Sequence, residues 1–269
     1  MEYLFARFQK IKELLRTKYI LLFLDYDGTL TPIAKRPQDA RLTAEKKQLL
    51  LALTKSSDLS LAIISGRALT DIKRIVGIPN AVYCGNHGLE IAGPKINFQA
   101  PLPPGYSKLL KNLQLDLRQR LSTIPGILIE GKGLSLSLHF RGAAKKNIPR
   151  VKTIFHEITI RPLVKNQIKI NLGKMVLEIR PPVNWDKGKA ALWLLARREF
   201  ALGGKRVFPI YAGDDLADED AFKALKSKGL TIFVGRPKKS AAAYYLRNPQ
   251  EVFGLLREIL KIKQAQEPS

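Results

Sequence analysis

The stretch Leu21-Leu22-Phe23-Leu24-Asp25-Tyr26-Asp27-Gly28-Thr29-Leu30-Thr31-Pro32-Ile33 joins an uninterrupted apolar segment to two carboxylates. Residues 20–24 show no alternation of apolar and polar side chains, which is typical of a strand covered on both faces in a parallel sheet. Asp25 and Asp27 are two residues apart, so their side chains leave an extended chain on the same side, and Gly28 permits a turn directly after them. Ligands of such sheets bind at the carboxyl ends of the strands. The stretch therefore predicts an α/β protein whose ligand site contains both acids.

Two neighbouring acids can divide the steps of a reaction between them. One can act as an ionised nucleophile and the other, protonated, as a general acid, while a metal ion limits the repulsion between them. Phosphoryl transfer is the chemistry that suits this arrangement. A short acidic turn after a buried strand is a common structural feature and stays the alternative for this stretch alone, so the other motifs must decide.

The composition is that of an ordinary globular protein. With 269 residues, of which 45% are hydrophobic and 26% charged, the chain is long enough for about two domains. The longest apolar run near the N-terminus, residues 20–24, is far shorter than a membrane span, and no signal-like segment precedes it, so a cytoplasmic location is expected. The single cysteine, Cys84, excludes an intramolecular disulfide and is expected to be a small buried residue beside the site.

The net charge is the unusual property of this chain. Its 46 Lys and Arg residues outnumber its 23 Asp and Glu residues and leave a charge of +23, which favours anionic partners, including nucleic acids. The basic residues are spread along the whole chain, however, without a basic arm, an RNA-binding signature or a metal-finger spacing. We therefore expect a cationic surface that attracts small anionic substrates or reflects the cellular setting, and we do not expect nucleic-acid binding as the main function.

A hydroxyl group follows the second predicted strand. Residues 59–64 read as a strand that ends in Ser65-Gly66-Arg67, and a helix is predicted over 68–76. A serine hydroxyl beside the backbone N–H groups that open a helix is suited to a phosphate ion. A serine that only caps the helix would give the same pattern, so this motif depends on the first one for its interpretation.

A lysine and a run of acids lie in the last third of the chain. Lys187 is predicted in the first turn of a helix over 185–200, where its charge opposes the helix dipole and a purely structural role is unfavourable. A strand over 207–211 leads into residues 214–220, five of which are acids. So dense a group of carboxylates is costly unless a cation offsets it. Lys187 is therefore a candidate phosphate ligand and the acidic run a candidate metal site.

Two proline-rich segments indicate an inserted domain. They are Pro101 to Gly105 and Pro181-Pro182, so we expect a core of residues 1–104 and 183–269 and an insertion of residues 105–182. In the insertion the predicted elements are helices over 107–121 and 147–160 and strands within 127–140 and over 168–172 and 175–180, a helix-strand-strand unit that occurs twice. In the core the other predicted elements are an amphipathic helix over 2–17, a helix after Thr43, strands over 81–84 and 230–234, and a closing helix over 248–261.

The motifs together resemble those of a known family. The order of the two acids, Ser65, Lys187 and the acidic run resembles the four motifs of the haloacid dehalogenase superfamily, and the segments Asp-Tyr-Asp-Gly-Thr-Leu-Thr-Pro-Ile and Ile-Ser-Gly-Arg are similar to those of its trehalose-6-phosphate phosphatases. One departure is Ala217, which stands where members of the family usually have Thr. The resemblance covers nearly the whole chain. It implies a doubly wound parallel sheet as the core and an inserted α/β cap made of two helix-strand-strand units.

The resemblance also implies a mechanism and a set of site residues. Asp25 would attack phosphorus, and Asp27 would protonate the leaving oxygen and then activate water. A Mg²⁺ ion would bind the Asp25 carboxylate, the backbone carbonyl of Asp27 and Asp214, with Asp215 in support. The phosphate ligands implied are Ser65, Gly66 and Lys187. The substrate contacts implied are Arg67, Asn86 and His87, with Glu90 beside them, and, in the cap, Glu130, Lys132 and Glu178.

The implied substrate is trehalose 6-phosphate, a small-molecule sugar phosphate. Sucrose 6-phosphate or a glycosyl-glycerate phosphate is the alternative within the same chemistry. A non-catalytic regulatory module that accompanies a trehalose-phosphate synthase is an alternative that the intact motif acids disfavour. A phosphatase of nucleic-acid ends is suggested by the charge alone, and a cap of about eighty residues would obstruct a polymer. Ordinary turns and solvated charges remain the structural alternatives for the Asn86-His87 segment and for the three charged residues of the cap.

Overall fold

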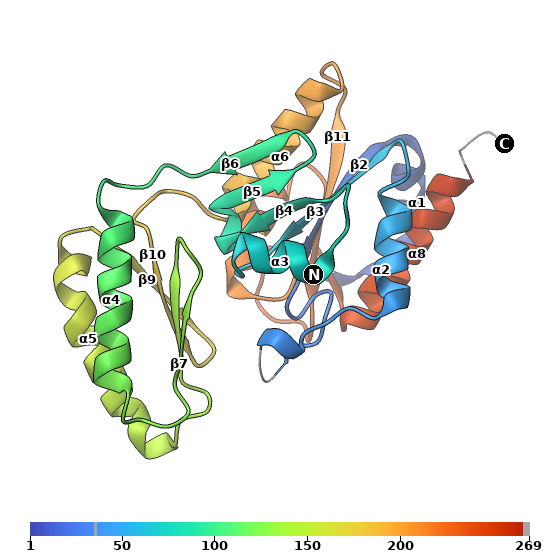
Figure 1. Ribbon diagram of the computed structural model, residues 1–269. Helices are drawn as coiled ribbons and strands as arrows, with labels where there is room; N and C mark the ends of the chain where they lie inside the picture. The colour runs from blue at the N-terminus through green and yellow to red at the C-terminus, as the bar shows by residue number, and fades with distance from the viewer. Residues whose placement is uncertain (35–36, 266–269) are drawn as a thin grey trace. The chain divides into compact units, whose positions relative to one another are not determined.

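The chain folds into two compact units. The structure is a computed structural model that describes residues 1–34 and 37–265. The core unit comprises residues 1–99 and 185–269, and the cap unit comprises residues 100–184 (Figure 1). The insertion expected from the sequence, residues 105–182, lies inside the cap unit. Among the described residues no helix is both long enough and apolar enough to cross a membrane.

A nine-stranded sheet forms the centre of the core unit. Its strand order is β1-β13-β12-β11-β2-β3-β4-β5-β6, and every neighbouring pair is parallel except β4 with β5 and β5 with β6. The strands are β1 (Glu2–Tyr3), β2 (Tyr19–Asp25), β3 (Leu59–Ile64), β4 (Val82–Gly85), β5 (Glu90–Gly93), β6 (Ile96–Gln99), β11 (Val207–Gly213), β12 (Leu230–Val234) and β13 (Tyr244–Leu246). The strand that carries Asp25 thus lies in the interior of the sheet, between β11 and β3.

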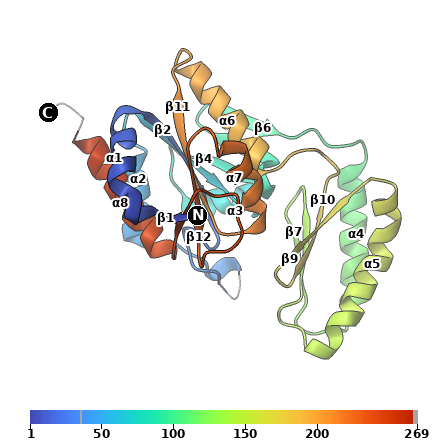
Figure 2. The ribbon, with the colours of Figure 1, turned by 180° about the vertical axis from the view of Figure 1, so that it is seen from behind.

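Helices cover both faces of this sheet. One face packs against α1 (Phe8–Thr17), α2 (Ala44–Leu53), α3 (Leu69–Val76) and α8 (Pro249–Gln264), and the other packs against α6 (Lys187–Ala201) and α7 (Glu219–Leu225). Figure 1 shows α3 on the side of the sheet that faces the viewer. In the reverse view of Figure 2, α6 and α7 lie on the side that faces the viewer. The side chains of β2 explain this layering, because Ile20, Leu22 and Leu24 belong to the first hydrophobic cluster and Leu21 and Phe23 to the second. The predicted doubly wound α/β core is confirmed.

The N-terminal segment differs from its prediction. The helix expected over residues 2–17 begins only at Phe8, after strand β1 and a 3₁₀ turn over Leu4–Arg7. Glu2 and Tyr3 pair with Tyr244 and Tyr245 of β13, a strand that the sequence did not indicate. The helix prediction was therefore wrong for Glu2 and Tyr3, because pairing with a partner more than 240 positions away along the chain overrides the local apolar spacing, and Leu4–Arg7 form a 3₁₀ turn where an α-helix was expected.

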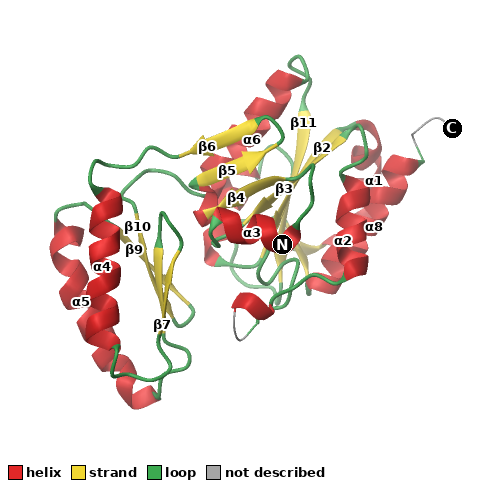
Figure 3. Cartoon of the chain, viewed as in Figure 1, coloured by secondary structure: helices red, strands yellow, loops and turns green. Residues whose placement is uncertain are grey.

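The cap unit is a four-stranded antiparallel sheet with two helices on one face. Its sheet order is β7-β8-β10-β9, and helices α4 and α5 lie side by side against it (Figure 3). The elements are α4 (Tyr106–Leu121), β7 (Leu128–Gly131), β8 (Leu136–His139), α5 (Ile148–Val164), β9 (Lys169–Gly173) and β10 (Val176–Arg180). Leu136 and Leu138 of β8 pack against the helices, so Ser137 points to the opposite face. The predicted pair of helix-strand-strand units is confirmed, and the face of the sheet away from the helices is polar.

Candidate active site

The motif segments meet at the carboxyl ends of three neighbouring strands. Asp25 is the last residue of β2 and pairs in register with Ile64, the residue before Ser65. On the other side of β2, Leu24 pairs with Ala212 of β11, and Gly213 and Asp214 follow. Because parallel strands end at the same edge of a sheet, the register alone places the first, second and fourth motifs side by side.

A buried lysine links two of the carboxylates. The Nζ atom of Lys187 lies 2.6 Å from Oδ1 of Asp25 and 2.7 Å from Oδ1 of Asp218, and all three side chains are at least nine-tenths buried. Lys187 is the first residue of α6, which the Asp186 side chain caps by accepting a hydrogen bond from the Lys189 backbone N–H. Asp186 thus fixes the residue at which α6 begins, and this places the Lys187 ammonium group at the end of β2.

Asp218 is held by further donors. The Tyr211 hydroxyl donates to its Oδ1 atom at 2.7 Å, and the Asp215 backbone N–H donates to its Oδ2 atom at 3.0 Å. Asp218 is fully buried, and Gly213 leaves it the necessary room, because a Cβ atom at that position would lie 2.3 Å from the Asp218 carboxyl carbon. Buried carboxylates need such partners, so Asp218 is the counter-ion that fixes Lys187.

Burial and mutual repulsion shift the ionisation of these groups. Burial raises the pKa of Asp25 well above its ordinary value, which Lys187 opposes and the charges of Asp218 and Asp214 reinforce. Burial, with Asp218 next in importance, raises the pKa of Asp214 to about 7. Burial by itself would lower the pKa of Lys187, but Asp218 and Asp25 outweigh it and raise that pKa. Burial is thus the main cause of the raised pKa values of both acids, and the neighbouring carboxylates add to it.

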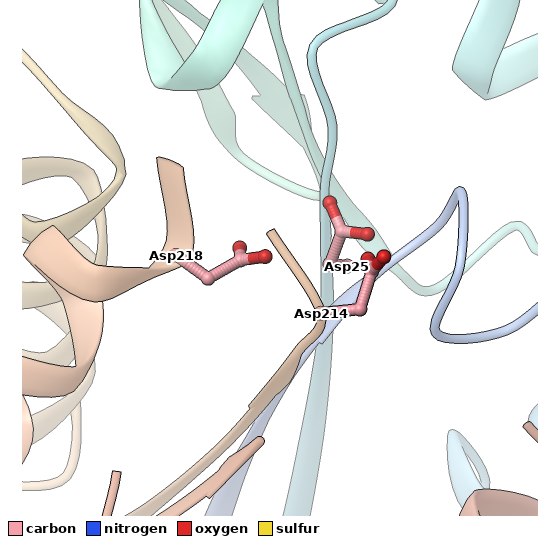
Figure 4. A group of neighbouring side chains, drawn as sticks. All are labelled: Asp25, Asp214 and Asp218. Carbon is pink, nitrogen blue, oxygen red and sulfur yellow. The ribbon is translucent and has the colours of Figure 1, made fainter. Parts of the chain in front are cut away.

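Three acids come close enough to share one cation. Asp25, Asp214 and Asp218 each offer a carboxylate oxygen, and these oxygens lie within 4.8 Å of one another (Figure 4). Gly28 makes this approach possible, because its φ is +99° and a Cβ atom there would lie 2.1 Å from Oδ2 of Asp214. Hard cations such as Mg²⁺ bind sets of carboxylate and carbonyl oxygens, so this group of three acids is a candidate cation site.

The grouping differs from the expected metal set of Asp25, Asp27, Asp214 and Asp215. Asp215 is exposed, and its carboxylate caps the short 3₁₀ helix Leu216–Asp218 by accepting from the Leu216 backbone N–H at 2.6 Å. Sequence reasoning missed Asp218 because the acidic run offers five carboxylates and its spacing does not show which one turns inward. In the structure Asp215 and Asp218 form a capping box at the start of the 3₁₀ helix, and Asp218 is the acid of the run that is fully buried.

Asp27 makes its contacts with an arginine. The guanidinium of Arg67 donates from Nε to Oδ2 of Asp27 at 2.7 Å and from Nη2 to Oδ1 at 2.6 Å, a two-bond contact. The Arg67 side chain is only 7% exposed and also reaches Asp71 at 3.2 Å. Arg67, expected as a substrate contact, is thus directed at the second acid of the first motif.

The Ser65 and Asn86-His87 segments form one loop assembly. The His87 backbone N–H donates to the Ser65 carbonyl at 2.9 Å, the Asn86 backbone N–H donates to the Arg67 carbonyl at 2.7 Å, and the Arg67 backbone N–H donates to the Ser65 hydroxyl at 3.2 Å. His87 packs so closely on Gly66 that a Cβ atom there would lie 2.5 Å from the imidazole Cε1 atom. The Asn86 amide donates to Glu90 at 2.5 Å. The expected residues Ser65, Gly66, Asn86, His87 and Glu90 therefore lie together, and Asn86 and Glu90 contact each other.

In the cap unit the three expected charged residues form one polar cluster. Ser137 pairs in register with both Glu130 of β7 and Glu178 of β10, so these side chains form a row on the polar face of the sheet. Glu178 accepts from Lys132 Nζ at 3.1 Å, from the Ser137 hydroxyl at 3.3 Å and from Arg180 Nε at 2.6 Å. The Glu178 and Lys132 side chains are 8% and 10% exposed, so they are not ordinary solvated charges.

Comparisons with known proteins agree with this geometry. The family model described as trehalose-phosphatase matches residues 23–250. A protein of Oryza sativa subsp. japonica named "Probable trehalose-phosphate phosphatase 4" is 35% identical over 96% of this chain and 70% of its own length. A solved structure titled trehalose-6-phosphate phosphatase related protein has a TM-score of 0.75 and 28% identity and covers 92% of this chain and 100% of its own. The C-terminal domain of a C. albicans trehalose-6-phosphate phosphatase shares the fold, with a TM-score of 0.76 and 23% identity. The match covers 95% of this chain and 98% of that domain. This chain belongs to the trehalose-phosphatase family.

Proposed function

We propose that this protein is a Mg²⁺-dependent phosphatase that hydrolyses trehalose 6-phosphate to trehalose and phosphate through an aspartyl-phosphate on Asp25. The observation that carries the proposal is the contact of 2.6 Å between Asp25 and Lys187 at the end of β2, beside Ser65 and Asp214. It joins a potential nucleophile, a cation for the phosphoryl oxygens, a hydroxyl and a metal-binding carboxylate at one edge of the sheet. The family of the chain supports trehalose 6-phosphate as the substrate.

Asp25 is suited to the nucleophilic step. One of its carboxylate oxygens forms a bond to phosphorus while the bond from phosphorus to the sugar oxygen breaks, and the released oxygen takes a proton from Asp27. Lys187, the Ser65 hydroxyl and the backbone N–H group of Gly66 hold the phosphoryl oxygens during this transfer. Asp218 and Tyr211 keep the Lys187 ammonium in place from the far side.

Hydrolysis of the aspartyl-phosphate uses the same groups in the second half of the reaction. Asp27, now a carboxylate, takes a proton from a water molecule whose oxygen forms a bond to phosphorus. The bond between phosphorus and Asp25 breaks, so inorganic phosphate leaves and the Asp25 carboxylate is restored. Both halves therefore need Asp27 at a fixed position beside the phosphoryl group.

The acids of the site fit a divalent cation. Asp218 already accepts from Lys187, Tyr211 and the Asp215 backbone, so the oxygens best placed to hold Mg²⁺ are the carboxylates of Asp25 and Asp214 with the backbone carbonyl of Asp27. A bound Mg²⁺ would supply positive charge to the phosphoryl oxygens and keep the buried acids ionised. Asp215 would support this shell indirectly, because its backbone N–H holds Asp218, the counter-ion of Lys187.

The polar cluster of the cap is the part of the chain that would distinguish one sugar from another. Glu130, Lys132 and Glu178 lie on one face and carry charged hydrogen-bonding groups that suit the hydroxyls of a disaccharide.

The expected link to a trehalose-phosphate synthase and the expected cytoplasmic location stay predictions.

A screen of phosphate release tests the proposed substrate. With Mg²⁺ present, we expect kcat/KM for trehalose 6-phosphate to exceed the values for sucrose 6-phosphate, a glucosyl-glycerate phosphate and glucose 6-phosphate. A preference for one of the other sugar phosphates would replace the substrate and keep the mechanism. Release from none of them would contradict the proposed function.

Loss of a charged group in the cap cluster should reduce turnover of the sugar phosphate selectively. We expect Glu130→Ala, Lys132→Ala and Glu178→Ala each to lower kcat/KM for trehalose 6-phosphate by about tenfold or more, because a hydrogen bond to a charged group contributes about 1.5–3 kcal/mol. Hydrolysis of p-nitrophenyl phosphate, which has no sugar, should change little. Glu178→Gln keeps the buried side chain in case Glu178→Ala fails to fold. Glu157→Ala, at an exposed position of α5, is the matched control. Equal losses on both substrates, or no loss on either, would refute a role in sugar recognition.

The stabilisation by Mg²⁺ should depend on pH. The pKa of Asp214 is about 7, and the pKa of Asp25 is also raised, so at pH 6 protons compete with the ion, and at pH 8 the carboxylates are more fully ionised. The pKa of Asp214 is higher in the folded protein than its ordinary value of 3.8. The metal-free fold therefore loses stability as the pH rises from about 3.8 to about 7. We therefore expect Mg²⁺ to raise Tm more at pH 8 than at pH 6. Scanning calorimetry measures both shifts. Asp214→Asn should lose most of the Mg²⁺ effect, and Asp116→Asn, on the exposed surface of α4, should keep it. A shift that is equal at both pH values, or larger at pH 6, would contradict the metal assignment.

A further inference from the structure

Arg67 and Asp71 form an ion-pair chain behind the second acid of the first motif. Two bonds of 2.6 and 2.7 Å join the Arg67 guanidinium to both oxygens of Asp27, and a third contact of 3.2 Å joins its Nη1 atom to Asp71. A planar guanidinium bound at two points fixes the carboxylate in distance and in rotation, which a single lysine contact does not do. Asp27 is 39% exposed and would otherwise be free to change rotamer.

The arginine is itself held from several sides. Its side chain is 7% exposed and its guanidinium lies 5.3 Å from the centre of the Tyr26 ring, whose hydroxyl donates to the Ala40 carbonyl at 2.8 Å. Its backbone carbonyl accepts from Asn86, and its backbone N–H donates to the Ser65 hydroxyl. Arg67, which holds Asp27 through its side chain, is thus hydrogen-bonded through its backbone to Ser65, the serine of the proposed phosphate site.

Asp71 anchors the outer edge of the guanidinium. It lies in the first turn of α3, four residues after Arg67, where a carboxylate is also favoured by the helix dipole. Arg74 binds its other oxygen at 2.5 Å. The charges therefore alternate in sign from Asp27 through Arg67 and Asp71 to Arg74, and Arg67 is the member that is shielded from solvent.

We propose that Arg67 is a positioning residue that holds Asp27 for proton transfer, and that Asp71 holds Arg67 in turn. This inference rests on the proposed function, in which Asp27 protonates the leaving sugar oxygen and later takes a proton from water. It differs from the substrate contact that the resemblance implies for Arg67, because both bonds of the two-point contact point to Asp27. A positioning role predicts a defect in the proton-transfer steps, and a substrate contact predicts a defect in binding.

The leaving group separates the two kinds of step. The p-nitrophenolate anion leaves without a proton, so formation of the aspartyl-phosphate from p-nitrophenyl phosphate needs no general acid, whereas the water that hydrolyses the intermediate still needs the base. In Arg67→Ala we expect p-nitrophenol to appear in a rapid first turnover with an unchanged rate constant, followed by a steady rate about 100-fold below that of the unaltered protein. With trehalose 6-phosphate both steps need the proton, so kcat should fall about 100-fold without a burst while KM changes little.

Matched variants complete the experiment. Asp27→Asn, which removes the acid and base directly, should reproduce the burst pattern of Arg67→Ala. Arg67→Lys keeps the charge but loses the two-point contact, and Asp71→Asn keeps an acceptor but loses the charge. Both variants should therefore have steady rates between that of Arg67→Ala and that of the unaltered protein. Arg257→Ala, which breaks an exposed pair with Glu45 elsewhere on the core unit, should behave as the unaltered protein does. Stopped-flow absorbance and the melting temperature are measured for each variant.

The outcomes separate this inference from the proposed function. If Asp27→Asn gives the burst and Arg67→Ala keeps the normal steady rate, the positioning role is wrong and the proposed mechanism stands. A raised KM for trehalose 6-phosphate with unchanged kcat in Arg67→Ala would also overturn the inference and make Arg67 a substrate contact. Loss of the first turnover together with the steady rate would show a structural role instead. Normal turnover of both substrates by Asp27→Asn would contradict the proposed function itself.

Discussion

Replacing Asp25 with Asn is expected to abolish the release of phosphate from trehalose 6-phosphate while the protein stays folded. The amide has nearly the volume of the carboxylate but lacks the charge that attacks phosphorus, so kcat should fall by about 10⁴-fold or more. The fold should persist, because Lys187 retains Asp218 as an anionic partner at 2.7 Å. Phosphate release and the melting temperature are the two measurements.

The same substitution should abolish turnover of p-nitrophenyl phosphate. Both substrates need the nucleophile, whatever their leaving group, so no burst of p-nitrophenol should remain. Asp116→Asn, which also removes one carboxylate, lies on the exposed surface of α4 and should leave turnover unchanged. An active Asp25→Asn protein would remove the aspartyl-phosphate from the mechanism.

Replacing Lys187 with Met should cost both stability and turnover. Lys187 is the cation between Asp25 and Asp218, and its side chain is 3% exposed. Removing one partner of a buried ion pair leaves an uncompensated charge and costs about 3–5 kcal/mol in the free energy of unfolding. Phosphate turnover should fall as well, because the phosphoryl oxygens lose their fixed positive charge.

The stability loss in Lys187→Met should shrink at low pH. Asp25 and Asp214 have raised pKa values already, so in the variant they can take up protons when the pH falls and so remove the unpaired charge. Denaturant unfolding at pH 5 and pH 8 measures the difference. Lys189→Met is the matched control, because this residue lies in the same helical turn, is 38% exposed and lies 3.9 Å from Asp186. An exposed pair of this kind contributes about 0–1 kcal/mol, so equal losses in the two variants would contradict the role given to Lys187.

The sequence predicted the parts of the fold in which local patterns and tertiary structure agree. β3 and β12 have the predicted bounds, because all their residues except Ser60 and Thr231 are apolar and nearly all of them are buried. The cap elements lie within a few residues of their predictions, since the alternation at Leu134 to His139 records one packed face and one polar face. By contrast, β1, β13 and the hairpin of β5 and β6 were not predicted. These strands are four residues long or shorter, and partners elsewhere in the chain decide their conformation.

The candidate site was predictable as a set of positions but not as a set of contacts. Motif order and strand ends indicated that Asp25, Ser65, Lys187 and Asp214 converge. The burial of Asp218 depends on a capping box and on the space above Gly213, and neither is visible in a count of acids. The pairing of Arg67 with Asp27 likewise depends on the register between β2 and β3. Such details follow from three-dimensional packing, which a linear pattern does not encode.

The strand order of the core unit has a consequence for the chain while it is being synthesised. β2 needs β3 on one side and β11 on the other, yet β11 is made more than 180 residues after β2 and only after the whole cap unit. The cap has its own hydrophobic cluster and antiparallel sheet, so its packing does not need the last third of the chain. Until residues 207–213 leave the ribosome, one edge of β2 has unpaired N–H and C=O groups in an apolar strand, the kind of edge that attracts other chains. Asp25 is the last residue of β2, so this open edge belongs to the strand that carries the proposed nucleophile.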